Sequence, residues 1–142
     1  MMGLLRSFFI PPCILLPSIQ TAIMSSFLKN RIKSIGYAAN GALLLLRTEA
    51  SAKVQAAIAC LTVIAGFCFG ISAVEWMLQL LAIAIVMSLE GVNTAIEKIA
   101  DFVHPDHHDK IGIIKDISAG AVFIAAVSAM IIGGIIYIPR IF

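Results

Sequence analysis

Three long apolar stretches limit what this chain of 142 residues can fold into, and they cover residues 53–71, 76–100 and 116–138. A bilayer core of about 30 Å needs about 20 helical residues, so each stretch is long enough to cross it. With 61% hydrophobic residues and a mean hydropathy of +1.03, the chain is far more apolar than a soluble domain. The sequence therefore predicts an all-α membrane protein with three transmembrane helices.

An amphipathic helix is predicted ahead of the first span, over about residues 25–48, with Ser25 or Ser26 as its N-cap. Apolar residues recur there at spacings of three and four, which places them in one stripe: Leu28, Ile32, Ile35, Ala39, Leu43 and Leu46. The opposite side carries Lys29, Lys33, Tyr37, Asn40 and Arg47. We therefore expect this helix to lie in the membrane surface, and an ordinary amphipathic core helix is the alternative.

The basic residues predict how the chain is oriented in the membrane. They lie before the first span and after the second, and residues 72–75 between these spans carry none. Those before the first span include Lys29, Arg31, Lys33, Arg47 and Lys53, and those after the second are Lys98, Lys110 and Lys115, while the carboxyl terminus, expected to face out, has the single Arg140. By the positive-inside rule, the surface helix and the loop at 98–115 face the cytoplasm. The net charge of +2 provides no clustered basic face, so no nucleic acid partner is expected.

Residues 1–23 are predicted to be an N-terminal extension of the membrane domain at 24–142. The extension is apolar, but Pro11, Pro12 and Pro17 interrupt it and it is too short to span a bilayer. Met24 is followed by SSFLKNRIKS and would make a natural start. An uncleaved membrane tether is the alternative.

Four polar residues follow the apolar part of the second span: Glu90, Asn93, Glu97 and Asp101. At about 100° per residue, they share one helical strip about 80° wide. Ionisable groups at membrane depth cost about 2.5–3.5 kcal/mol on insertion scales, so they usually mark a functional site. A solvated helix end would explain Glu97 and Asp101, but not the deeper Glu90 and Asn93.

Carboxylates at graded depth suit the transfer of a phosphoryl group to a membrane alcohol. Mg²⁺ binds carboxylate oxygens together with substrate phosphates, and a separate carboxylate such as Glu90 can act as a base. Glu49 lies on the same side of the membrane and can supply a second metal ligand, while Lys53 can neutralise charge. The chain has neither a G-x-x-x-x-G-K-[ST] loop nor a G-x-G-x-x-G motif, which excludes the familiar soluble nucleotide cradles.

The motifs E-x-x-N-T-A-I-E-x-x-x-D at Glu90–Asp101 and I-K-D-x-x-A-G-A-V at 114–122 resemble the small bacterial membrane lipid kinases, diacylglycerol kinase and undecaprenol kinase. R-I-K-S-x-G-Y, T-E-A and the H-H pair add to this resemblance. It extends from about Ser25 to the end of the chain. It implies a homotrimer in which each protomer has a surface helix and three transmembrane helices, with active sites shared between neighbouring chains.

The resemblance also implies roles for individual residues. Glu90 is the expected catalytic carboxylate near the lipid hydroxyl, with Asn93 and Lys53 on the substrate side. Glu49 and Glu97 are expected to hold Mg²⁺ between the ATP phosphates. The residues expected to bind the nucleotide are Arg31, Tyr37, Glu49, Glu97, Asp101, Asp106, His107, His108, Lys115 and Asp116.

Three positions depart from the family pattern, and one of them is Gln55, which replaces an acidic or histidine residue near the lipid cleft. The N-terminal arginine of the proteobacterial members aligns with Asn30, which leaves Arg31 as a displaced candidate, and His107 stands where relatives have tyrosine. The S-A-G-A-V ending is closer to the undecaprenol kinase type than to the proteobacterial S-A-A-V.

The expected function is transfer of the γ-phosphate of ATP, with Mg²⁺, to diacylglycerol or undecaprenol, giving phosphatidic acid or undecaprenyl phosphate. The expected location is the bacterial inner membrane, with the active site on the cytoplasmic side. The alternatives are a small ion or proton transporter and a non-catalytic membrane subunit. A transporter predicts polar groups through the whole bilayer, yet the third span offers only Ser118 and Ser128. A non-catalytic subunit leaves the carboxylate strip unexplained.

Overall fold

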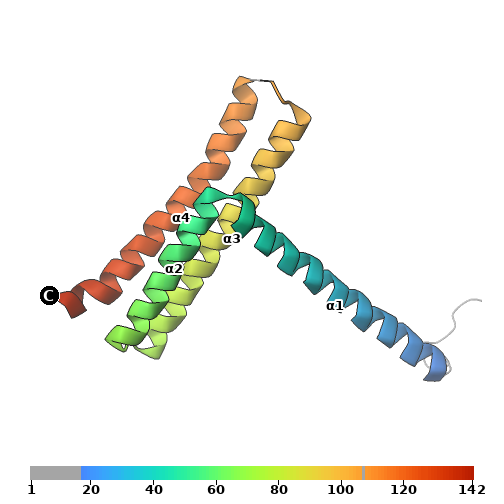
Figure 1. Cartoon of the computed structure of the whole chain (residues 1–142), viewed down its shortest axis with the longest axis horizontal. Coiled ribbons are helices and arrows are strands. Elements are labelled where there is room, and N and C mark those ends of the chain that lie inside the picture. The colour runs from blue at the N-terminus through green and yellow to red at the C-terminus, as the bar shows by residue number, and fades with distance from the viewer. Residues whose placement is uncertain (1–16, 107) are drawn as a thin grey trace, which may run out of the picture. The chain divides into compact units, whose positions relative to one another are not determined.

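The computed structural model describes residues 17–106 and 108–142. All regular structure in these ranges is helical (Figure 1): α1 Pro17–Thr48, α2 Ala50–Phe69, α3 Ala73–Val103 and α4 Asp109–Ile141. Three of these helices, α2, α3 and α4, are long and apolar enough to cross a membrane. The expected all-α fold with three spanning helices is therefore confirmed.

The chain divides into two units within α1, one ending at Asn40 and the other starting at Gly41. The described part of the first unit, residues 17–40, is continuously helical. In this unit the Ser34 hydroxyl donates to the Asn30 carbonyl oxygen over 2.9 Å. The second unit holds the last turns of α1 together with α2, α3 and α4.

Helix α1 begins at Pro17, upstream of the expected start near residue 25, so Ser25 and Ser26 lie inside the helix. The physical reason is that proline suits the first helical turn, where its missing N–H has no intrahelical partner to lose. Residues 18–24 then contain neither glycine nor proline to stop the helix. Residues 1–16 of the expected extension lie outside the described residues.

A tight turn joins α2 to α3. Gly70 adopts a left-handed conformation with φ 60° and ψ 46°, which a glycine reaches without the penalty of a Cβ atom. The Ile71 N–H then donates to the Gly66 carbonyl oxygen over 3.2 Å and closes the end of α2. Ser72 and Glu75 form a capping box that starts α3 immediately afterwards. The turn therefore makes α2 and α3 antiparallel neighbours, as Figure 1 shows.

Helix α3 is the central element of the second unit, because it packs against both α2 and α4 and most extensively against α4. Near the α2–α3 turn, the Trp76 ring lies against Gly66, where an added Cβ would come within 2.8 Å of the ring. The Phe67 ring also contacts Trp76, with ring centroids 4.8 Å apart. Glycine at position 66 therefore allows α2 and α3 to approach closely at this end.

The connection between α3 and α4 is shorter than the predicted loop at 98–115. It consists of residues 104–108, because α3 continues to Val103 and α4 already starts at Asp109. His108 acts as the N-cap of α4, where its Nδ1 accepts from the Lys110 N–H over 3.2 Å. Asp109 in the first turn also suits the positive end of the helix dipole. Lys115 and Asp116 therefore lie on α4 and not in a loop.

A polar cluster of Thr62, Gln79 and Tyr137, here named the Gln79 cluster, joins the three spanning helices. Gln79 is only 5% exposed, and its Nε2 donates to the Thr62 carbonyl oxygen over 3.1 Å. The Tyr137 hydroxyl donates to Gln79 Oε1 over 2.6 Å and also lies 2.9 Å from the Thr62 carbonyl oxygen. One buried amide thus links α2 and α4 through α3.

Replacing Gln79 with leucine is expected to destabilise the second unit by about 1–2 kcal/mol, because hydrogen bonds between membrane helices are worth roughly this amount. Thermal loss of helicity in detergent micelles measures the change. Ser128→Ala is the matched control, since the Ser128 hydroxyl donates to Ile124 of its own helix. Equal melting midpoints for Gln79→Leu and the native protein would contradict the linking role of the cluster.

Candidate active site

Glu90 lies buried on α3, 5% exposed, and its carboxylate faces α2. The Ser51 hydroxyl donates to its Oε1. Gln55 Nε2 donates to its Oε2 over 3.0 Å. Ser51 and Gln55 are one turn apart on α2, so both face the same carboxylate. Each oxygen of this buried acid therefore has a hydrogen-bond donor, as a buried polar group requires.

Asn93 is the next polar residue along α3 and lies between Glu97 and α4. Its Nδ2 donates to Glu97 Oε1 over 3.0 Å, and its Oδ1 accepts from the Ser118 hydroxyl. Asn93 and Ser118 are each 8% exposed. Because the donor and acceptor ends of the amide have different partners, its orientation is determined. Ser118 on α4 thereby helps to place the Glu97 carboxylate on α3.

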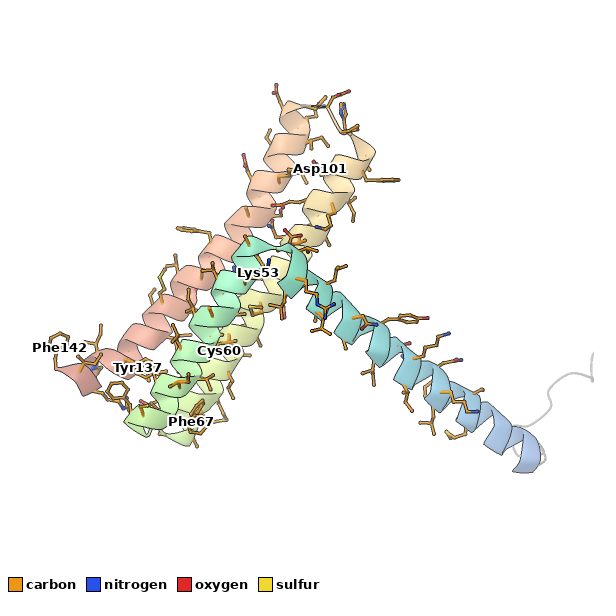
Figure 2. The ribbon with its side chains drawn as sticks, in the orientation of Figure 1. Lys53, Cys60, Phe67, Asp101, Tyr137 and Phe142 are labelled. Atoms are coloured by element: carbon orange, nitrogen blue, oxygen red, sulfur yellow. The ribbon has the colours of Figure 1, made fainter. Side chains whose placement is uncertain are left out.

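Asp101 and Lys115 form an ion pair between the ends of α3 and α4 that adjoin their connection. Figure 2 labels Asp101 at this end of the pair of helices. Asp106, His108 and Asp116 are exposed in the same part of the chain. The structure thus brings together Asp101 and Lys115 of the predicted nucleotide residues, while His107 lies outside the described residues.

Glu49 is the single residue between α1 and α2, in extended conformation with φ −97° and ψ 126°. Its Oε1 accepts from Lys98 Nζ over 2.6 Å and from the Thr48 hydroxyl over 3.0 Å. The hydrogen bond from Lys98, and then that from Thr48, lower the pKa of Glu49, with smaller contributions from the positive charges of Lys98 and Lys53. Lys53 follows Glu49 by one turn and is exposed.

The lowered pKa of Glu49 fixes how this contact depends on pH. The stabilisation it contributes is fully present above the ordinary glutamate pKa and is lost as the pH falls through the lowered folded-state pKa. Solvent screens the pair, so its effect on stability is small. Glu49 is therefore ionised at neutral pH, which is the form that binds a cation.

The predicted metal ligands Glu49 and Glu97 lie on different elements and have different hydrogen-bond partners. In the described part of the chain, no three histidine, cysteine or acidic residues cluster as a metal site. Mg²⁺ in phosphoryl transfer nevertheless commonly uses one or two carboxylates, with phosphates and water completing its shell. The two glutamates therefore fit Mg²⁺ by the chemistry of their donors.

Arg31 and Tyr37, the remaining predicted nucleotide residues, belong to the first unit. The Arg31 guanidinium lies 5.0 Å from the centre of the Phe27 ring. Lys33 Nζ lies 5.9 Å from the centre of the Tyr37 ring. Both contacts are cation–π contacts within α1. The nucleotide roles of Arg31 and Tyr37 remain predictions.

Two polar residues of the site, Ser51 and Ser118, were not among the predicted site residues, and Gln55 was expected only to lie near the lipid cleft. The available signal was their position in otherwise apolar spans, since a polar side chain at that depth needs a partner. Ser118 was considered only as a residue too isolated to form an ion path. The structure shows instead that it is the α4 partner of Asn93.

Taken together, the fold and site are those of a helical membrane protein with a buried carboxylate, Glu90, between two of its spanning helices. Residues 36–137 match the family described as prokaryotic diacylglycerol kinase. The chain belongs to this family and is a lipid kinase. The two alternatives, an ion or proton transporter and a non-catalytic membrane subunit, are therefore set aside.

Individual relatives agree with this assignment. The chain is 40% identical over 109 residues to an undecaprenol kinase of Bacillus subtilis, covering 77% of this chain and 89% of that one. It is 31% identical over 111 residues to a diacylglycerol kinase of Synechocystis, covering 78% of this chain and 63% of that one. It is also 28% identical over 111 residues to a diacylglycerol kinase of Haemophilus influenzae, covering 78% and 94% respectively.

Proposed function

We propose that this chain transfers the γ-phosphate of ATP, with Mg²⁺, to the hydroxyl group of a membrane lipid alcohol. The observation that carries the proposal is the buried Glu90 carboxylate on a helix able to span a membrane, with both oxygens held by donors from α2. A carboxylate at this depth can reach a lipid hydroxyl that stays in its bilayer.

In the proposed reaction, Glu90 takes the proton of the lipid hydroxyl. The hydroxyl oxygen then forms a bond to the γ-phosphorus as the bond from that phosphorus to the β–γ bridging oxygen breaks, and ADP leaves. Proton transfer by a positioned carboxylate typically contributes about 10²- to 10⁴-fold to the rate. The rest of phosphoryl transfer is positioning and charge neutralisation, so a small helical protein can supply it.

Glu49 and Glu97 would hold Mg²⁺, and the bound ion neutralises negative charge on the phosphates. Asn93 holds the Glu97 carboxylate in place through its 3.0 Å hydrogen bond. The proposed nucleotide contacts are Lys115 and Asp116 on α4, together with Asp101 and residues 106–108. Arg31 and Tyr37 are proposed as further contacts. Lys53, one turn after Glu49, supplies positive charge close to that carboxylate.

A cavity of about 290 Å³ supports a lipid as the acceptor. It lies between α2, α3 and α4, and its lining is almost entirely apolar. Gln55, a partner of Glu90, lies at one end of the lining, and Gln79 and Tyr137 contribute to the other. Apolar space therefore adjoins the partner of the proposed base, as a hydrocarbon chain requires.

We further propose that the working form is a homotrimer in the bacterial inner membrane. The surface helix and the α3–α4 connection face the cytoplasm, where ATP is available, because the basic residues gather on that side. Neighbouring protomers share each active site. Such sharing allows ligands of one Mg²⁺ or nucleotide to come from two chains.

Of the two candidate acceptors, we propose undecaprenol. The supporting observation is the 40% identity to the Bacillus subtilis undecaprenol kinase, against 28% and 31% to two diacylglycerol kinases. The product would then be undecaprenyl phosphate. If diacylglycerol were the acceptor instead, the product would be phosphatidic acid.

Labelled ATP, with undecaprenol and diacylglycerol tested side by side in the same mixed micelles, decides between these acceptors. We expect the purified protein to give a higher kcat/KM with undecaprenol. A higher value with diacylglycerol would overturn the choice of lipid and leave the kinase chemistry in place. Transfer to neither lipid would overturn the proposed function itself.

A further inference from the structure

We propose that Ser51 and Gln55 are positioning residues for Glu90, and that they hold its carboxylate in the orientation that takes the hydroxyl proton. This inference rests on the proposed function of Glu90 as the base. It assigns a role to two residues of α2 that contact neither the nucleotide nor the metal in the proposed mechanism.

The spacing of the two donors, Ser51 and Gln55, matches the shape of one carboxylate. Residues four apart on a helix lie one above the other on the same face. The hydroxyl of Ser51 and the amide of Gln55 accordingly reach Oε1 and Oε2 of the same side chain. A single donor would leave the carboxylate free to rotate, whereas two donors from one rigid helix determine its plane.

Ser51 and Gln55 use only part of the hydrogen-bonding capacity of the Glu90 carboxylate. An ionised carboxylate offers about four acceptor sites, of which Ser51 and Gln55 take two. Among the described residues, no further hydrogen bond occupies the other lone pairs of Oε1 and Oε2, so a lipid hydroxyl that reached this buried carboxylate could use them. The contacts therefore orient the proposed base without blocking it.

The Gln55 amide has one orientation that is compatible with the Glu90 carboxylate. Its Nε2 must face Glu90, because its own oxygen would be repelled by a carboxylate oxygen at 3.0 Å. This orientation leaves Gln55 Oε1 buried and, among the residues that the structure describes, without a hydrogen-bond partner. A buried polar atom without a partner is rare and calls for a cause other than stability. Orientation of Glu90 is such a cause.

The test uses the full chain and compares Ser51→Ala, Ser51→Thr and Gln55→Met, with Ser128→Ala as the matched serine control. Ser51→Ala removes one donor, Ser51→Thr keeps the hydroxyl, and Gln55→Met keeps the size of the side chain without its amide. We expect kcat to fall about 10-fold in Ser51→Ala and in Gln55→Met, because hydrogen bonds to a charged group are among the stronger ones.

The KM for ATP should stay within about twofold of native in both variants, and so should the KM for the lipid in Ser51→Ala, since the lost contact acts on the proposed base and Ser51 does not line the apolar cavity. Ser51→Thr should restore kcat to near the native value. Thermal unfolding in the same micelles shows whether each variant remains folded at the assay temperature.

Three results would overturn the positioning role: native kcat in both Ser51→Ala and Gln55→Met, an equal loss in Ser51→Thr, or a loss that only follows the unfolded fraction. Failure of the proposed function looks different. In that case the native protein would transfer no phosphate, or Glu90→Gln would be as active as the native protein.

Discussion

Glu90→Gln is expected to remain folded and to lose phosphoryl transfer to lipid, with kcat lower by about 10²- to 10⁴-fold, the usual contribution of a general base. The substitution preserves the shape of the side chain. Its amide oxygen can still accept from Gln55 Nε2, and its NH₂ group can donate to the Ser51 hydroxyl oxygen. An amide cannot take a proton from an alcohol, so the chemistry is lost while the contacts with α2 are kept.

Labelled phosphate recovered in the lipid fraction measures this loss, and the melting midpoint in micelles measures folding. Glu75→Gln is the matched control, because Glu75 lies at the other end of α3, where it pairs with Arg140 at 2.8 Å. That variant should transfer phosphate at the native rate. Full activity of Glu90→Gln would remove Glu90 from the role of base.

Glu97→Gln and Glu49→Gln are each expected to raise the Mg²⁺ concentration for half-maximal activity by about 10-fold or more, in the range found when metal-site partners are removed. An amide carries no charge and binds a hard divalent cation less well than a carboxylate does. Glu97→Gln should have the larger effect, because Asn93 Nδ2 holds the Glu97 carboxylate in place for binding.

A Mg²⁺ titration of the initial rate at saturating ATP measures the change, and Mn²⁺ binding followed by electron paramagnetic resonance in the presence of ADP measures it without turnover. Glu75→Gln should titrate like the native protein. If either site variant also titrated like the native protein by both methods, its glutamate would no longer be a candidate ligand.

Much of the fold follows from the length and polarity of the apolar stretches. Each span had to be helical, since a bilayer leaves no other way for a single segment to pair its backbone groups. The spacing of Glu90, Asn93 and Glu97 put them on one strip of a helix, and in the structure Asn93 and Glu97 are hydrogen-bonded one turn apart. Periodicity within one helix is therefore readable from the sequence.

The partners across helices could not be predicted in this way. Whether Ser118 faces Asn93, or Ser51 faces Glu90, depends on how each helix is rotated about its own axis when it packs. That rotation is decided by many small contacts between spans that are apolar on every side. A single serine in such a span adds no periodic signal, so its partner becomes visible only in the folded structure.

The ends of the helices were the other part that the sequence left open. The apolar pattern predicted a fourth helix from about residue 116, but residues 109–115, which include Asp109, Lys110 and Lys115, also form helix once His108 caps it. Pro17 was interpreted as a break, although proline is well placed in a first turn. Hydropathy locates membrane spans, whereas capping groups decide where the helices stop.

The close approach at Gly66 has a geometric consequence for the proposed base. Helix α2 is a rigid rod, and Ser51 lies about 22 Å along it from Gly66 at 1.5 Å per residue. At Gly66 the Trp76 ring of α3 leaves no room for a Cβ atom. A side chain at this position that pushed α2 away from α3 would therefore also shift Ser51 and Gln55, at the far end of the same helix, relative to Glu90.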